Sequence, residues 1–392
     1  MTVFPRVIAT FTVVISTVLS VVGSGAAAAA TPVMIPAPPS LAATAYVLMD
    51  AQTGKVIISK NTDQRLPPAS LTKLMTSYIA DYELAQGNIS IDDKVLISEK
   101  AWRTQGSRMF IREGTQVTVE DLLKGIIIQS GNDASVAMAE HIAGSEDAFA
   151  DLMTQHAGQL GMVNTQFQNA TGLPKENHFT TAGDLALLAR AIIRDYPQHY
   201  GMYSEKYFTY NKIRQPNRNK LLWRDNRVDG LKTGHTEEAG YCLVASAKDK
   251  GMRLVSVVMG TRSEEARAQE SQKLLAYGFR YYESVSLYQS NEVLNTARIW
   301  AGTQDTLNLG VSEPVTITIP RGQSKALAVT LDLDKVIEAP ITQGTSYGML
   351  NISLGDEVLK RVPVVALESV EPAGLFTRIW HSILRFFTSL FG

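Results

Sequence analysis

The sequence predicts an α/β (α+β) domain, in which helices pack against an antiparallel sheet, followed by a small all-β domain and an amphipathic C-terminal helix. Three observations support this fold class. Strand-like patterns stand at both ends of residues 44–285, with mainly helical patterns between them, an order typical of a mixed domain. Residues 286–369 alternate apolar and polar side chains as strands do. Residues 370–392 carry apolar residues at helical spacing.

The N-terminus has the order of charged, apolar and small residues that is typical of a secretory signal peptide. Arg6 precedes an apolar run, Val7–Val22, and small residues follow as far as Ala30. We therefore expect residues 1–30 to be a cleaved signal peptide of a bacterial protein, and residues 31–43, rich in proline, to be a linker. An uncleaved membrane anchor is the alternative, which the short apolar run and the alanine tract disfavour.

The region 44–285 begins with a predicted β-hairpin that leads into a helix. Ala45–Met49 and Val56–Ser59 have strand-like patterns on either side of a turn-like segment. Pro67 and Pro68 then indicate a helix start, because proline is tolerated only at or before the first helical turn. The residues that follow have the apolar spacing of one helical face: Leu71, Leu74, Met75, Tyr78 and Ile79.

The rest of this region continues with helices and ends with strands. A polar break at residues 129–133 precedes a predicted helix over Ala134–Ile142. The other predicted elements are a helix over Ala182–Arg194, a strand edge at Leu231–His235, two strands over Gly240–Ala247 and Met252–Met259, and a closing helix over Glu264–Phe279.

Three polar clusters in this region contain the residue types of a nucleophilic enzyme. They are Ser70-x-x-Lys73, Ser130-Gly131-Asn132 and Lys232-Thr233-Gly234. The first cluster alone is weak evidence, because Ser70 could be a helix N-cap and Lys73 a solvated helix residue. All three occur in this order, on a helix start, a loop and a strand edge. The same triple, with Asp in place of Gly in the second cluster, is characteristic of active-site serine enzymes of the penicillin-binding and class A β-lactamase type.

On these motifs the chain resembles the low-molecular-weight penicillin-binding proteins of class C, the serine D-alanyl-D-alanine carboxypeptidases. The resemblance covers nearly all of the chain after the signal peptide, and it implies a serine β-lactamase/DD-peptidase-like fold for residues 44–285. The segments that carry it are Pro67–Lys73, Ser130–Ala134, Asn217–Asn219, Leu221–Trp223, Asp229–Thr236, Arg267 and Glu270–Ser271.

The resemblance implies a catalytic role for three residues. Ser70 would attack the carbonyl of the penultimate D-alanine and form an acyl-enzyme, Lys73 would be the base, and Ser130 would relay a proton to the leaving amine. An ordinary lysine has a pKa of about 10.4 and is protonated at neutral pH. Burial and a second cation would lower the pKa of Lys73, and Lys232 is the expected second cation.

Substrate binding is implied for a further set of residues. Backbone N–H groups of Ser70 and His235 would form the oxyanion hole, and Thr233 and Arg267 would hold the terminal carboxylate of the substrate. Arg218 is a weaker candidate for the same neighbourhood, with a structural ion pair as the equal alternative. The full set implied for binding is Asn132, Lys232, Thr233, Gly234, His235, Arg267 and Arg218.

The C-terminal part of the chain shows no catalytic constellation. Alternating runs around residues 315–319, 327–333 and 350–354 predict a β-rich domain, which we interpret as a spacer, with partner binding as the alternative. In Gly374–Gly392, large apolar residues share one broad helical face, opposite Arg378 and Arg385. This pattern predicts a helix that lies in the membrane interface, with docking on the β-rich domain as the alternative.

Composition excludes several classes of function. The formal net charge of −1 and the lack of basic tracts argue against nucleic-acid binding. Cys242 is the single cysteine, so an intrachain disulfide is excluded. The six histidines show no metal-binding spacing, and we expect neither a metal nor a cofactor.

The resemblance also implies partners and a location. The partners are the peptidoglycan pentapeptide that ends in D-Ala-D-Ala, β-lactam antibiotics, and the bacterial inner membrane, whose outer face the C-terminal helix would contact from the periplasm. A transpeptidase or an endopeptidase would use the same residues. No glutamate has the context of a β-lactamase deacylation base, which disfavours that activity. A membrane-associated binding or scaffolding protein with a weakly active or inactive penicillin-binding site is the alternative of another class.

Overall fold

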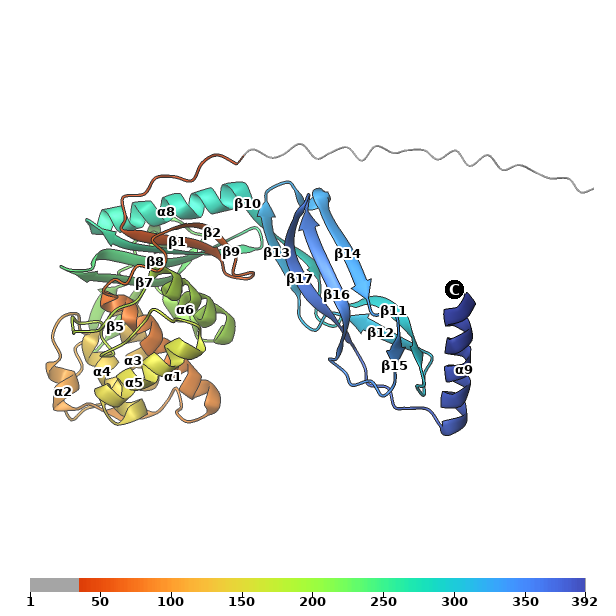
Figure 1. Ribbon diagram of the computed structural model, residues 1–392. Coiled ribbons are helices and arrows are strands. Elements are labelled where there is room, and N and C mark those ends of the chain that lie inside the picture. Colours follow the sequence, from red (N-terminus) through yellow and green to blue (C-terminus); the bar gives the residue numbers. More distant parts are fainter. Residues whose placement is uncertain (1–34, 392) are drawn as a thin grey trace, which may run out of the picture. The chain divides into compact units, whose positions relative to one another are not determined.

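The computed structural model describes residues 35–391 (Figure 1). The predicted signal peptide, residues 1–30, and residues 31–34 of the predicted linker lie outside the described residues. Side chains between residues 41 and 279 form two hydrophobic cores, and side chains between residues 299 and 370 form a third. The predicted fold class, an antiparallel sheet with helices followed by a small all-β domain and a terminal helix, is confirmed.

The first domain is built around a five-stranded sheet in which all neighbouring strands are antiparallel. The strand order is β2-β1-β9-β8-β7, so that the strands from the beginning of the domain pair with strands from its end, and β7 lies at one edge. The strands are β1 (Ala45–Asp50), β2 (Val56–Lys60), β7 (Val228–Thr236), β8 (Gly240–Asp249) and β9 (Met252–Thr261).

Helices cover both faces of this sheet. Because side chains alternate between the two faces of a strand, β1 contributes to two cores. Val47 and Met49 pack with the helices of one layer, whereas Tyr46 and Leu48 pack with helix α8 (Glu264–Tyr281). Figure 1 shows α8 along one face of the sheet and the remaining longer helices beyond the other. Those helices are α1 (Lys73–Gln86), α3 (Val119–Lys124), α4 (Asn132–Ala143), α5 (Glu146–Gln159) and α6 (Ala182–Asp195).

Short polar residues determine where several helices begin. The side-chain oxygens of Ser145, Thr181 and Ser263 each accept a hydrogen bond from the backbone N–H three residues later, at the starts of α5, α6 and α8. Such N-caps satisfy donors that the helix itself leaves unpaired. Smaller elements complete the domain: α2 (Glu99–Arg103), α7 (Leu221–Arg224), η3 (Tyr200–Ser204), and the hairpins β3–β4 (Lys94–Leu96, Gln116–Thr118) and β5–β6 (Tyr207–Tyr210, Ile213–Pro216).

The helix predicted after Pro67 and Pro68 forms with a different first turn. Residues Ala69–Thr72 make a 3-10 turn, η1, and α1 follows directly from Lys73. Ser70 therefore lies on the 3-10 turn, and Lys73 is the first residue of the α-helix. The expected closeness of the two side chains is retained, because residues three apart are also neighbours in a 3-10 helix.

The apolar run that precedes Ser130 forms an unusual helix. After α3 the chain continues as a π-helix, η2 (Gly125–Gln129), which ends at Ser130 in the left-handed conformation, with φ 66° and ψ 37°. Left-handed backbone is uncommon for a residue with a side chain, and π-helical turns occur often at functional sites. The local backbone thus marks Ser130 as a special position.

The second domain is all-β with its own core. Strand β10 (Tyr282–Tyr288) follows α8 directly and pairs with β13 (Val315–Pro320). The larger sheet has the order β14-β16-β17-β12-β11-β15. Its strands are β11 (Val293–Trp300), β12 (Thr306–Gly310), β14 (Leu327–Leu333), β15 (Ile337–Glu338), β16 (Ser346–Leu354) and β17 (Glu357–Ala366). The three alternating runs seen in the sequence lie in β13, β14 and β16.

The C-terminal residues form the predicted helix, α9 (Leu375–Phe391). Two side chains of its polar side bind the β-rich domain: His381 Nδ1 accepts from the Ala301 N–H at 3.0 Å, and Arg385 pairs with Glu338 at 2.6 Å. The large apolar side chains remain exposed: Leu375, Phe376, Ile379, Trp380, Ile383 and Phe386. Over residues 35–391, we find no helix with the length and apolar character needed to cross a bilayer.

One glycine allows a loop to approach the turn that carries Ser70. Gly172 has φ +81°, and a Cβ built there would overlap the backbone carbonyl of Ala69. Gly161 has a similar φ of +80° but open space around it. Gly161→Ala should cost about 1–2 kcal/mol from the left-handed backbone alone.

Gly172→Ala should cost roughly 2 kcal/mol more than Gly161→Ala, since backbone atoms must also move. Urea unfolding of both variants measures the difference. Equal losses of stability would show that the loop does not press on the Ser70 turn.

Candidate active site

The three polar clusters converge on one cleft of about 200 Å³. Ser70 comes from the 3-10 turn, Ser130 from the end of the π-helix, and Thr233 from the edge strand β7. The predicted residues Lys73, Asn132 and Lys232 lie buried behind this surface, with exposed fractions of 1%, 4% and 3%. The complete lining is Ser70, Ser107, Ser130, Arg218, Thr233, Gly234, His235, Tyr241, Glu264 and Arg267.

The Lys73 amine is the centre of the hydrogen-bond network. Its Nζ atom lies 3.2 Å from Ser70 Oγ, 2.7 Å from Asn132 Oδ1 and 2.5 Å from the Thr171 carbonyl oxygen. As an ammonium it donates to all three oxygens. As a neutral amine it has two donors for Asn132 and Thr171, and its lone pair can accept the Ser70 proton. The geometry therefore suits a nucleophile and its base.

Burial makes the neutral amine accessible at ordinary pH. Burial and, as a smaller effect, the Arg218 guanidinium together lower the pKa of Lys73 to about 7, against the opposing effect of the Asp133 and Glu146 carboxylates. At pH 7 about half of such amines are neutral, compared with about one in 2,500 for a lysine at its ordinary pKa. The buried position thus raises the fraction of competent base about a thousandfold.

The identity of the second cation differs from the prediction. We expected Lys232 to lower the pKa of Lys73, whereas Arg218 has this effect. Lys232 is itself fully buried, and burial, followed by the cations of Lys73, Arg218 and Arg267, lowers its pKa. A lysine held towards its neutral form exerts little charge on its neighbour, which explains the correction. The Lys232 amine donates to the Thr233 carbonyl at 3.1 Å.

Asn132 and Asp133 fasten a loop over the cleft. Asn132 Nδ2 donates to the Gln105 carbonyl at 2.6 Å, while its Oδ1 accepts from Lys73. The buried Asp133 carboxylate accepts backbone hydrogen bonds from residues 109, 110, 111 and 134 at 2.9–3.3 Å. Burial raises the pKa of Asp133, although these four donors act in the opposite direction. The loop that carries Ser107 is therefore held directly by the second motif.

The edge strand β7 passes close to the Ser70 turn. A Cβ at Gly234 would lie 3.2 Å from both the Pro68 carbonyl oxygen and Leu71 Cγ, so glycine permits the close packing. Because β7 is the outermost strand of the five-stranded sheet, its outer edge is not paired within that sheet. An extended peptide could add there as a further strand. His235 stacks on Tyr241 of β8, with ring centroids 3.9 Å apart.

Two guanidinium groups stand at the cleft beside β7. Arg267 is buried, and its Nη1 donates to the Gly234 carbonyl at 3.1 Å. Arg218 is exposed at the cleft, and its Nε donates to the Gln129 carbonyl at 3.0 Å. Within residues 35–391 no carboxylate lies within ion-pair distance of Arg218, so the alternative of a structural ion pair does not describe its contacts. Both arginines can approach an anionic ligand.

A second cavity of about 580 Å³ adjoins the same turn. It is lined by residues 65–69, residues 172–179, Thr236 and Glu238, and thus continues from Ala69 and from the end of β7. His178 lies in its wall and contacts Thr72 Oγ1 through Nε2 at 2.9 Å. Burial, with the nearby cations of Lys175 and Lys73, lowers the pKa of His178 to about 4, so this ring is neutral at pH 7.

Several residues of the site were missed by the sequence analysis. The motif around Ser130 includes Asp133, but its anchoring role depends on the loop at residues 109–111, which is more than 20 residues away in sequence. The turn that presents the Thr171 carbonyl was not considered. Its segment, Asn169-Ala170-Thr171-Gly172, has the residue types of an Asx turn, which was the available signal. In the described part of the chain, no group of three or more His, Cys, Asp or Glu side chains could hold a metal ion.

Comparison with known proteins places this geometry in a family. The model of the family described as D-alanyl-D-alanine carboxypeptidase matches residues 32–263, and that of the penicillin-binding protein 5 C-terminal domain matches residues 282–372. The chain is 45% identical to the D-alanyl-D-alanine carboxypeptidase DacC of Escherichia coli, over 90% of each chain. It is 42% identical to DacA of the same organism, over 92% of this chain and 91% of the relative.

Solved structures of penicillin-binding proteins are similar to this fold. Penicillin-binding protein 5 from Haemophilus influenzae superimposes with a TM-score of 0.82 at 42% identity, over 86% of this chain and 99% of the other. Penicillin-binding protein D2 from Listeria monocytogenes, in its ampicillin-bound form, has a TM-score of 0.58 at 30% identity, over 62% of this chain and all of the other (100%). The protein is a peptidase of the D-alanyl-D-alanine carboxypeptidase family, as the motifs predicted.

The Arg218 charge provides a test of how the Lys73 amine is tuned. Because this guanidinium lowers the pKa of Lys73, Arg218→Ala should raise that pKa. The neutral amine is then reached at a higher pH, so the acidic limb of the acylation rate with a labelled penicillin should move to higher pH. Arg218→Lys keeps the positive charge and should leave the limb near its original position. An unmoved limb in Arg218→Ala would contradict the electrostatic effect.

Proposed function

We propose that the protein is a serine-type D-alanyl-D-alanine carboxypeptidase. It removes the terminal D-alanine from peptidoglycan stem pentapeptides through an acyl-enzyme on Ser70, and β-lactams acylate the same residue. The observation that carries this proposal is the Lys73 amine, buried, with its pKa lowered to about 7 and its Nζ 3.2 Å from Ser70 Oγ. The ampicillin-bound relative supports the β-lactam part.

The first half of the reaction forms the acyl-enzyme. The neutral Lys73 amine accepts the Ser70 proton as Oγ attacks the penultimate D-alanine carbonyl. The backbone N–H groups of Ser70 and His235 stabilise the oxyanion. When the C–N bond breaks, a proton passes through Ser130 to the nitrogen of the terminal D-alanine, which leaves as the free amino acid. The Ser70 ester retains the rest of the stem peptide.

The second half regenerates the enzyme. A water molecule gives a proton to the Lys73 amine and attacks the ester carbonyl. Ser70 leaves as the alcohol after it regains a proton, and the product is a stem tetrapeptide with a new carboxylate. The same base thus serves both halves, which is consistent with a site that has one lysine in contact with the nucleophile.

Substrate recognition uses the edges of the cleft. The stem peptide pairs with the outer edge of β7, and Asn132 binds its amide. The terminal carboxylate lies against Thr233 and Arg267, with Arg218 nearby, because a guanidinium binds a carboxylate through two parallel hydrogen bonds. The preceding residues of the stem extend past Thr236 into the 580 Å³ cavity. Lys232 stays buried below the strand and supports it.

We further propose that the protein acts in the periplasm, attached to the outer face of the inner membrane by α9. The exposed apolar face of this helix, which includes Phe376, Trp380 and Phe386, supports an interfacial position. The arginines Arg378 and Arg385 suit anionic lipid headgroups. A scaffolding protein with an inactive site is the other candidate, and no contact in the cleft favours it over the enzyme.

Release of D-alanine tests the proposed activity. The protein should liberate one free D-alanine from each peptide that ends in D-Ala-D-Ala, and Ser70→Ala should lower this rate by about a thousandfold or more, because the nucleophile is lost. The same variant should not be labelled by a fluorescent penicillin, while its melting temperature stays near that of the original protein. Labelling of Ser70→Ala would remove Ser70 from the mechanism.

The anchor is tested by sedimentation with vesicles. The chain with α9 should pellet with vesicles that contain anionic phosphatidylglycerol, and a chain that ends at Ala373, which keeps the β-rich domain whole, should stay in the supernatant. Both should release D-alanine at the same rate from a soluble peptide, which serves as the control for folding. Pelleting of the shortened chain would assign membrane binding to another part of the protein.

A further inference from the structure

A turn outside the three motifs touches both the nucleophile's turn and its base. The Thr171 carbonyl accepts from Lys73 Nζ at 2.5 Å, and the Ala170 carbonyl accepts from Thr76 Oγ1 of α1 at 2.8 Å. Gly172 packs against the Ala69 carbonyl, one residue before Ser70. The turn from Asn169 to Leu173 therefore spans Ser70 and Lys73, and its conformation determines where the acceptor for Lys73 lies.

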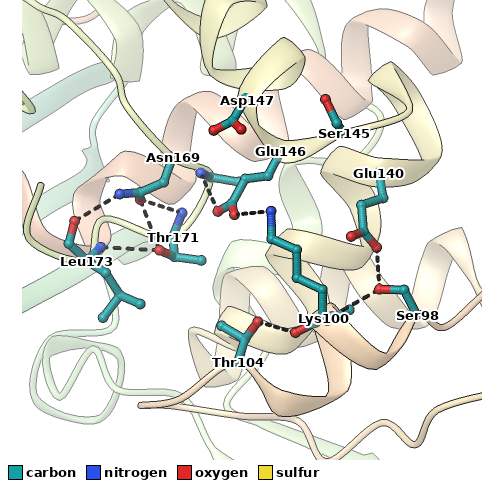
Figure 2. Close-up of polar contacts among 12 residues, drawn as sticks. Ser98, Lys100, Thr104, Glu140, Ser145, Glu146, Asp147, Asn169, Thr171 and Leu173 are labelled. Carbon is teal, nitrogen blue, oxygen red and sulfur yellow. Dashed lines mark hydrogen bonds and ion pairs between the residues drawn. The ribbon is translucent and has the colours of Figure 1, made fainter.

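The Asn169 side chain holds this turn together. Its Oδ1 accepts from the Thr171 N–H at 3.1 Å, the Thr171 hydroxyl at 2.9 Å and the Gly172 N–H at 2.7 Å. Its Nδ2 donates to the Leu173 carbonyl at 2.9 Å. Figure 2 shows the bonds from Thr171 and Leu173 meeting at the Asn169 side chain. Asn169 is buried, with 9% of its surface exposed, so one side chain satisfies four groups of a tight loop.

We propose that Asn169 is a positioning residue for the proposed acylation: it holds the Thr171 carbonyl where that carbonyl orients the Lys73 amine towards Ser70. The inference rests on the proposed function of Ser70 and Lys73. Asn169 touches neither residue in the recorded hydrogen bonds, and acts through the backbone of Thr171.

Orientation matters because a neutral amine has one lone pair. With two N–H groups directed to Asn132 Oδ1 and the Thr171 carbonyl, the remaining position on Nζ faces Ser70 Oγ. After the proton moves from Ser70 to Lys73, the resulting ammonium has three donors for the same three oxygens. If the Thr171 carbonyl moves away, the amine can rotate and the ammonium loses an acceptor. Both effects slow the step that forms the acyl-enzyme.

An ion pair supports the turn from the opposite side. Glu146, at the start of α5, accepts from the Ala170 N–H at 3.3 Å, and its other carboxylate oxygen pairs with Lys100 of α2 at 3.0 Å. Figure 2 shows Glu146 between Lys100 and the Asn169 turn. The Glu146 charge also raises the pKa of Lys73. The turn is thus fixed at Ala170 by Glu146 and at Thr171 and Gly172 by Asn169.

Two substitutions at Asn169 separate positioning from simple structural support. Asn169→Ala removes all four hydrogen bonds, and we expect acylation by a labelled penicillin to fall about tenfold or more at every pH. Asn169→Asp keeps an acceptor for Thr171 and Gly172. Its plateau rate, which is the acylation rate at pH values above the acidic limb, should therefore be close to that of the original protein and well above that of Asn169→Ala. Its added negative charge near Lys73 favours the ammonium, so the acidic limb should move to higher pH.

The matched control is Asn164→Ala, in the same loop region. Within residues 35–391 the Asn164 side chain accepts a hydrogen bond from Arg65 alone, at 3.4 Å. This variant should keep the acylation rate of the original protein and the position of the acidic limb in its pH profile. A plateau rate and limb in Asn169→Ala equal to those of the original protein would overturn the proposal. So would an Asn169→Asp variant whose plateau acylation rate stays about tenfold below that of the original protein although its acceptor oxygens are retained, and that result decides the matter if Asn169→Ala does not fold.

The proposed function can fail separately from this inference. If the original protein is acylated by penicillin but releases no D-alanine, the carboxypeptidase assignment fails, while the Asn169 variants still report on acylation. If the original protein is not acylated at all, both proposals are overturned. A purely structural role for Asn169 would lower the melting temperature of Asn169→Ala and leave the plateau acylation rate of the folded variant unchanged, which is also contrary to the proposal.

Discussion

The structure depends on one buried amine. Lys73 is a lysine with 1% exposure, and a charged group in that position is costly unless its pKa falls or its charge is matched. Here the pKa falls to about 7, and three oxygens surround Nζ, so that either protonation state is satisfied. The elements that supply these oxygens must therefore be held within hydrogen-bond distance of the start of α1. The loops, glycines and caps of the domain can be understood from this requirement.

The elements of the active site come together because two backbone segments pack closely against the turn that carries Ser70. Gly172 and Gly234 approach the Ser70 turn from two directions, one from the loop after α5 and one from the edge strand β7. A side chain at either position would displace its segment by a fraction of an ångström or more. Displacement of that size is sufficient to lengthen the hydrogen bonds on which the amine depends. The active-site geometry is thus a property of packing around residues 68–73, as much as of the reactive groups themselves.

Sequence reasoning succeeded where local chemistry decides structure. The two prolines before Ser70, the alternating runs of the β-rich domain and the apolar face of α9 each follow from neighbouring residues, and the three motifs identified the cleft. It failed where the partner is distant in sequence. Arg218 lowers the pKa of Lys73, whereas the sequence predicted that Lys232 would do so, because the effect depends on which of the two side chains stays charged in the folded protein. The hydrogen bonds from residues 109–111 to Asp133, and the effect of Asn169 on the position of the Thr171 carbonyl, can be identified only from the folded structure.

The cations of the cleft combine base tuning with substrate selection. The positive charges of Arg218 and Arg267 lower the pKa of Lys232, and the charge of Arg218 also lowers the pKa of Lys73. In the proposed reaction the substrate brings a terminal carboxylate to these arginines. Its charge opposes theirs, so binding would raise the pKa of Lys73, which makes the neutral amine a stronger base towards Ser70 while a smaller fraction of the amine is neutral at pH 7. A peptide without that carboxylate would lack both the attachment and the electrostatic change. Preference for a free C-terminus and activation of the base would then have the same physical origin.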